Sequence, residues 1–273
     1  EQLHATDIIS REKKFIDTFT NILKFLSLTI LTDYLLSNLK DRNINDKIKS
    51  LYTPKISDWN EFLRVSLPIL EYEKVPLSIP EIINYYKNIE SQISKRNKIL
   101  HKKGYYNSEG EYINTKDKLG YFSSLISYRN SIAHGVGSEN SSKIEKFKAV
   151  YHILEKILSD LNFIKNYQMY ANHFDSNILL KGIIPTYTDL ISSKYDPLKV
   201  SIFLINPNGV QRPLSPLFIN GKIAIKNPTE NSLGRYNHFI CDKITDKRIF
   251  YVSPEGIELT TEITIEYWKK LLK

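Results

Sequence analysis

Cysteine is almost absent from this sequence, in which Cys241 is the only one among 273 residues. A single thiol excludes an internal disulfide framework and any zinc site built from several cysteines. This composition favours a reducing compartment, so we expect a cytoplasmic protein.

Several motifs of nucleotide and metal chemistry are also absent. The chain has no Walker-type GxxxxGK[ST], no GxGxxG and no GxSxG. Phosphate-loop, Rossmann-type and GxSxG hydrolase functions therefore have no support. The histidines never fall in an HExxH spacing. They are His4, His101, His134, His152, His173 and His238. We therefore expect neither a metal nor a cofactor.

A long uninterrupted apolar run is missing as well. The most apolar stretch, residues 22–39, is broken by polar side chains that include Lys24 and Asp33, so we expect no membrane span and no membrane partner. No signal peptide is recognisable. The sequence starts at Glu1 and its only methionine is Met169, which predicts a further domain or sensor partner before Glu1.

What the sequence does contain is helical periodicity over its first 165 residues. Apolar residues recur there every three or four positions, the period of an amphipathic helix. The predicted helices span residues 6–39, 59–67, 80–101, 115–135 and 141–164. Between them, polar residues and Pro54 predict a turn over residues 41–58, and clustered Gly, Asn and Ser predict a loop over residues 104–116.

After Lys165 the pattern changes to short β-branched runs and turn residues. A strand is predicted over residues 199–206, and Asn220-Gly221 predicts a two-residue hairpin between residues 217–219 and 222–225. A second hairpin is predicted from residues 238–242 and 248–252, with a final helix over 262–272. The predicted fold class is thus multidomain α and α+β, an all-helical bundle (residues 1–165) followed by a small β-rich α+β domain (residues 166–273).

The candidate active site is the stretch from Arg129 to Gly135. On a helix, Asn130 and His134 lie about 40° apart, and the long side chain of Arg129 can reach the same region. Imidazole titrates near neutrality and guanidinium matches the geometry of phosphate. Such groups suit RNA cleavage by an attacking 2′-hydroxyl, with His134 as acid or base, Arg129 stabilising charge and Asn130 orienting a partner. One histidine cannot easily make both proton transfers, whereas two copies related by a two-fold axis can.

Arg129, Asn130 and His134, with Ser127-Tyr128 before them and Ala133 and Gly135 beside the histidine, resemble the Arg-x(4–6)-His signature of the HEPN domains. The resemblance covers residues 1–165. It implies an all-helical bundle that dimerises and acts as a metal-independent endoribonuclease in toxin systems or antiviral defence. Residues 166–273 would then serve as a sensing, oligomerising or partner-binding module, an assignment that rests on architecture alone.

A basic run precedes this stretch and repeats its spacing from Arg96 to His101, without small residues around the histidine. One interpretation is a solvated helix end that interacts with its own dipole; the other is a groove for the RNA backbone. The candidate RNA-binding residues are Lys95, Arg96, Lys98, His101, Lys102 and Lys103. The net charge of +8 is compatible with an RNA partner but does not demonstrate one.

Two other functions remain open from the sequence. The chain can be a catalytically silent HEPN-like scaffold for dimerisation or RNA binding, joined to a ligand-sensing domain. It can also be a helical nucleotide-handling module that works with a nucleotidyltransferase partner.

Overall fold

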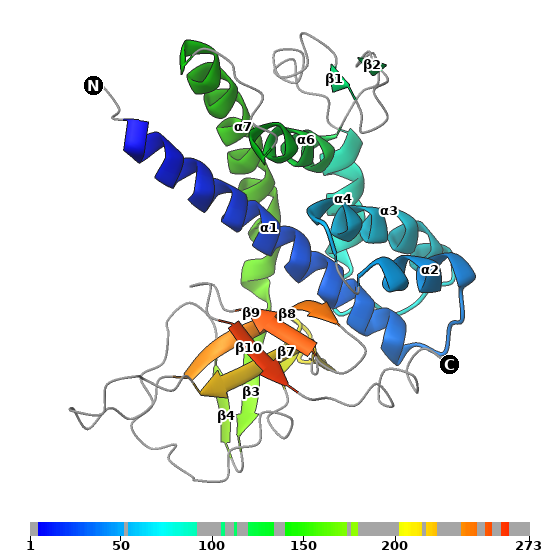
Figure 1. The fold of residues 1–273 in the computed structure, drawn as a ribbon. Coiled ribbons are helices and arrows are strands. Elements are labelled where there is room, and N and C mark those ends of the chain that lie inside the picture. The colour runs from blue at the N-terminus through cyan, green and yellow to red at the C-terminus, as the bar shows by residue number, and fades with distance from the viewer. Residues whose placement is uncertain are drawn as a thin grey trace, which may run out of the picture. The chain divides into compact units, whose positions relative to one another are not determined.

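A computed structural model describes residues 5–51, 54–91, 105–106, 112–113, 120–133, 140–173, 176–179, 202–214, 217–222, 236–244, 249–252 and 258–261 (Figure 1). The described chain is mostly helical, and most of its antiparallel strands follow the helices. Contacts group it into two compact units. The first unit comprises Glu1–Leu23 and Glu81–Phe163, and the second comprises Lys24–Pro80 and Ile164–Lys273. The predicted division at residue 165 stays a prediction.

Helix α1 (Ala5–Leu36) confirms the first predicted helix. Its apolar positions are buried as the helical period predicts, with Phe15, Phe19 and Leu23 at most 5% exposed. The segment Ser10–Leu36 is long and apolar enough to cross a membrane, a test that a buried core helix also passes. Within its most apolar window 61% of the helix is buried inside the protein, which agrees with a core helix.

The first unit continues with α4 (Glu81–Ser91), α6 (Tyr121–Ala133) and α7 (Asn140–Asp160). Phe122, near the start of α6, is fully buried among the helices of this unit. Its ring lies 5.9 Å from those of Phe19 and Tyr86 and 6.2 Å from that of Tyr85. These ring pairs join α1, α4 and α6, and such contacts add to the burial of apolar area.

The predicted loop over residues 104–116 is wrong for its four described residues. Tyr105–Tyr106 (β1) and Tyr112–Ile113 (β2) pair as a short antiparallel ladder. Tyrosine and isoleucine favour strands, a preference that the prediction of a loop did not take into account. The predicted helical residues 92–101 and 115–119 lie outside the described chain.

In the second unit the predicted turn over residues 41–58 is wrong, because α2 (Arg42–Ser50) forms there. The Asp41 carboxylate accepts a hydrogen bond from the Ile44 N–H at 3.0 Å, and Ile44 and Ile48 are buried. An N-cap and two apolar residues four positions apart therefore stabilise a helix that its polar composition concealed.

Helix α3 (Ile56–Tyr72) is longer than predicted at both ends. It passes through Pro68, although proline removes one helical hydrogen bond. Pro68 and Arg64, the residue four positions earlier, are both exposed, so water can replace the missing donor. At the start, Asp58 accepts a hydrogen bond from the Lys55 N–H at 2.7 Å. A 3₁₀ turn, η1 (Leu161–Asn166), follows α7 along the chain.

The strands of the second unit form two antiparallel sheets of four strands each among the described residues. One has the order β4-β3-β5-β6, with β3 (Gln168–His173), β4 (Ser176–Leu179), β5 (Ile202–Ile205) and β6 (Gln211–Pro213). The other has the order β10-β9-β8-β7, with β7 (Phe218–Lys222), β8 (Tyr236–Ile244), β9 (Ile249–Val252) and β10 (Glu258–Thr261).

Two of the predicted strand features are confirmed and one is wrong. The strand over 199–206 corresponds to β5, and the hairpin over 238–252 corresponds to β8 and β9. Asn220 and Gly221, however, lie inside β7, where they pair with His238 and Asn237 of β8. The long-range ladder prevails over the local turn preference. The predicted helix over 262–272 lies outside the described chain.

Candidate active site

Helix α6 carries Arg129 and Asn130, and a half-buried carboxylate fixes where it begins. Glu90 at the end of α4 accepts hydrogen bonds from the Phe122 N–H at 2.9 Å and the Ser123 hydroxyl at 2.9 Å. Burial raises the pKa of Glu90, while these hydrogen bonds act in the opposite direction. The first N–H groups of a helix have no partner within the helix, so the Glu90 side chain takes the place of a local N-cap.

Gly120 allows α4 and α6 to approach this closely. A Cβ at that position would lie 2.5 Å from both the Cα and the carbonyl oxygen of Glu90. These are backbone atoms, which cannot move aside as a flexible side chain can. A residue without a side chain is therefore required where α6 begins.

The last turns of α6 are held by α1. The Tyr128 hydroxyl donates a 2.6 Å hydrogen bond to Glu12, and its ring meets that of Phe15 edge to face at 6.3 Å. Burial, and next the hydrogen bond to Glu12, raise the pKa of Tyr128. The phenol therefore stays protonated and acts as the donor. These two contacts set the rotation of α6 about its axis.

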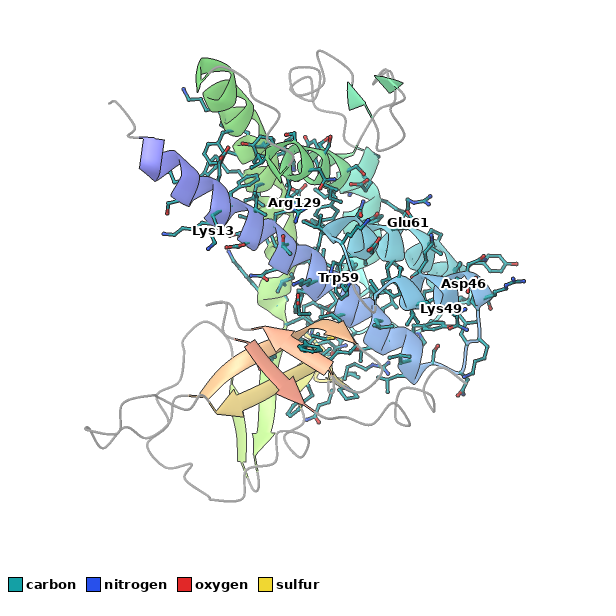
Figure 2. All side chains as sticks on the ribbon, viewed as in Figure 1. Lys13, Asp46, Lys49, Trp59, Glu61 and Arg129 are labelled. Carbon is teal, nitrogen blue, oxygen red and sulfur yellow. The ribbon has the colours of Figure 1, made fainter. Side chains whose placement is uncertain are left out.

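This rotation leaves Arg129 exposed at the surface and Asn130 half-buried beside it. The Arg129 Nη1 donates to the Asn130 Oδ1 at 3.2 Å. Figure 2 shows Arg129 on α6, together with Lys13 on α1. Two of the three predicted catalytic side chains are thus brought together, with the guanidinium in solvent where a phosphate can reach it.

The third predicted catalytic residue, His134, follows the last residue of α6 in the sequence and lies outside the described residues. The six candidate RNA-binding residues do too. They are Lys95, Arg96, Lys98, His101, Lys102 and Lys103.

The described residues contain no group of three or more His, Cys, Asp or Glu side chains that could hold a metal ion. Asp242 lies in β8 and pairs with Lys24 of α1. Beside it the Cys241 thiol is fully buried, which raises its pKa.

Sequence reasoning missed Glu90, Gly120 and Glu12, which position α6. Tyr128 and Glu12 are 116 positions apart in the chain, a separation at which helical periodicity carries no information. Gly120 did carry a weak signal, because it directly precedes the first helical residue, Tyr121.

Comparisons with protein-family models, curated proteins and solved structures found no match to this chain. The resemblance to the HEPN domains therefore rests on the residues alone.

Proposed function

We propose that the protein is a metal-independent endoribonuclease of the HEPN type, acting in the cytoplasm as an effector of a toxin or antiviral defence system. One observation supports this most directly: Arg129 and Asn130 are hydrogen-bonded neighbours on the exposed end of α6. In the sequence, His134 lies four residues beyond Asn130. An imidazole can act as acid or base in phosphoryl transfer without a bound cofactor, a guanidinium can stabilise the developing charge, and an amide can orient either group.

The proposed reaction begins with attack of the 2′-hydroxyl oxygen on the neighbouring phosphorus. The bond from phosphorus to the 5′-oxygen breaks, giving a 2′,3′-cyclic phosphate and a 5′-hydroxyl. His134 of one protomer accepts the 2′-hydroxyl proton, and His134 of the second protomer donates a proton to the leaving 5′-oxygen. Arg129 offers two parallel N–H donors to the phosphorane oxygens, and Asn130 holds the guanidinium in position.

A composite site explains how a chain with one histidine in the motif makes both proton transfers. Two identical protomers related by a two-fold axis place the same residues on both sides of one cleft. Addition of excess His134→Ala protein to the wild type should then inhibit cleavage, because mixed dimers retain only one imidazole.

The decisive experiment measures cleavage of single-stranded RNA in EDTA. We expect His134→Ala to reduce the rate at least ~100-fold, the scale of one lost proton transfer, while its circular dichroism spectrum is unchanged. Arg129→Lys should also lose activity, because lysine keeps the charge but lacks the planar fork. His101→Ala is the matched control, since it lies in the near-repeat of the motif and should affect KM rather than kcat.

Full activity in His134→Ala, or no cleavage by the wild type together with normal RNA binding, would favour the silent scaffold. Cleavage that disappears in EDTA and returns with a divalent cation would point to a different mechanism. Partner modification that fails in Arg129→Ala before any RNA phenotype appears would instead favour the nucleotidyltransferase-associated module.

A further inference from the structure

A groove in the first unit lies between α1 and α7, and the proposed cleavage chemistry does not use it. It encloses a cavity of about 610 Å³, within the range of about 300–1,000 Å³ of small-ligand sites. Its lining is mainly apolar, and Phe15, Leu154 and Leu158 contribute to it. Leu158 is 46% exposed, so the groove is open to solvent.

Aromatic rings run along this groove in a continuous series. The ring of Phe147 lies 5.7 Å from that of Phe15 and 6.2 Å from that of Tyr151, which lies 6.4 Å from His152. Tyr151 is 48% exposed. Its ring is supported by Phe147, yet much of it remains accessible to a planar ligand.

Positive charge lies on both walls of the groove. Arg11 and Lys14 come from α1, and Lys148 comes from α7. Among the described residues, no carboxylate pairs with Lys14 or Lys148. The single acidic side chain of the lining, Glu155, lies 2.9 Å from His152 Nδ1. The groove thus combines a cationic rim with an aromatic floor.

One residue of the groove also contacts the helix that carries the candidate active site. Phe15 lines the groove and packs against both Phe147 and Tyr128. Tyr128 directly precedes Arg129 on α6. Phe15 therefore connects the lining of the groove to α6, the helix that carries Arg129.

We propose that this groove binds an unpaired segment of RNA, with a base stacked on Tyr151 and the backbone phosphates paired with Lys14 and Lys148. This inference rests on the proposed function. Every base offers a flat face to an aromatic ring, and cations neutralise the backbone, which is how single strands are held without sequence preference. The groove then orients the strand whose neighbouring phosphate meets Arg129.

The test measures binding separately from cleavage. The probe is a fluorescein-labelled single-stranded oligonucleotide with 2′-O-methyl groups throughout, which cannot undergo 2′-hydroxyl attack, and polarisation is measured in EDTA over a range of salt concentrations. We expect Tyr151→Leu to weaken binding about tenfold without changing the salt dependence, since it removes the ring but keeps an apolar side chain. Tyr151→Phe should bind like the wild type.

The lysine variants test the electrostatic part. Each phosphate contact with a single strand contributes about 0.7 to the slope of log affinity against log salt. The double variant Lys14→Ala/Lys148→Ala should therefore lower this slope by about 1.4. Lys13→Ala is the matched control, because it removes the same charge from the adjacent exposed position of α1, which does not line the groove.

Wild-type affinity in Tyr151→Leu, or equal loss in Lys13→Ala and Lys14→Ala, would overturn the proposal. If Tyr151→Leu shifts the protein from dimer to monomer with unchanged RNA affinity, the groove belongs to a second copy and the proposal is wrong. Preferential capture of an acidic helical peptide over the oligonucleotide would overturn it too. Binding that depends on Tyr151, in a protein that never cleaves RNA, would retain the groove and remove the proposed function.

Discussion

Two charged surfaces of this protein differ in whether their basic side chains pair with carboxylates. On α2 and α3 every basic side chain pairs with a carboxylate: Arg42 and Lys49 with Asp46, Lys47 and Arg64 with Glu61. Along the groove between α1 and α7, no described carboxylate pairs with Lys14 or Lys148. Charges that are already paired contribute to the fold, whereas cations left in solvent beside exposed aromatic rings are available to an anionic ligand.

Buried polar groups of the second unit also differ from the groove lysines, because they have partners inside the protein. In the second unit Asp33 of α1 is 3% exposed and accepts hydrogen bonds from the Ser78 N–H at 2.8 Å and the Ser78 hydroxyl at 2.5 Å. Lys24 is also buried and pairs with Asp242. These groups are satisfied inside the protein, so changing them should alter stability before binding.

The largest expected effect is the pH dependence that Asp33 imposes. Burial raises the pKa of Asp33 to about 6, against 3.8 for an unperturbed aspartate. The protonated form is therefore favoured in the folded state. The stability that this gives is complete below pH 3.8 and is lost as the pH rises to about 6, a change of about 3 kcal/mol. Asp33→Asn should remove this component, as urea unfolding at pH 4 and pH 7 would reveal. An equal pH dependence in the variant would contradict the prediction.

The next largest effect concerns Gly120. Gly120→Ala should destabilise the protein by about 2–3 kcal/mol, because the new Cβ meets the backbone of Glu90. Gly209 is the matched glycine of the second unit, with open space around it and φ of +77°. Gly209→Ala should cost only about 1 kcal/mol of backbone strain. Chemical denaturation of both variants compares the two costs, and equal values would show that space at Gly120 is not limiting.

A smaller effect is expected at Glu61. Its pKa is lowered to about 2, chiefly by the hydrogen bond from Arg64, so its stabilisation is present above pH 4.5 and is lost as the pH falls towards 2. Because the Glu61 side chain is 33% exposed, solvent screening limits the pairs to about 1 kcal/mol at most. Glu61→Gln should lower the melting temperature slightly at pH 7 and leave it unchanged near pH 2. A larger loss at pH 2 than at pH 7 would contradict this assignment.

The smallest effect is expected in the groove. Lys14→Ala and Lys148→Ala should each change the free energy of unfolding by less than about 0.5 kcal/mol, since neither removes an ion pair among the described residues. Lys47→Ala, which breaks the 3.0 Å contact with Glu61, provides the comparison. If the groove lysines proved as costly as Lys47, the contrast between the two surfaces would not hold.

Local patterns predicted those elements whose own residues decide their structure. The period of apolar residues located α1 and the start of α4, and β-branched residues located β5 and the β8–β9 hairpin. At α2 the polar composition led to the wrong prediction of a turn, because two buried isoleucines and the Asp41 cap were sufficient for a helix. At Asn220-Gly221 a turn preference worth little free energy gave way to pairing along the whole of β7.

Of the candidate active site, the sequence predicted only the residues that are close together along the chain. Arg129 and Asn130 are sequence neighbours, and the long Arg129 side chain reaches the Asn130 Oδ1 at 3.2 Å. The groove could not be predicted, because its walls come from residues 11–18 and 147–158, and a helical pattern does not indicate which helix lies beside it.

The sequence by itself determined that helices precede antiparallel strands, and that an arginine and an amide are adjacent ahead of a histidine. Only the tertiary structure decided that Glu90 of α4 caps the start of α6, that Glu12 and Phe15 fix the rotation of α6, and that Asp33 is buried. The physical reason is the separation along the chain over which each interaction acts. Backbone preference and periodicity act over a few residues. Hydrogen bonding and burial between distant segments depend instead on how the whole chain packs.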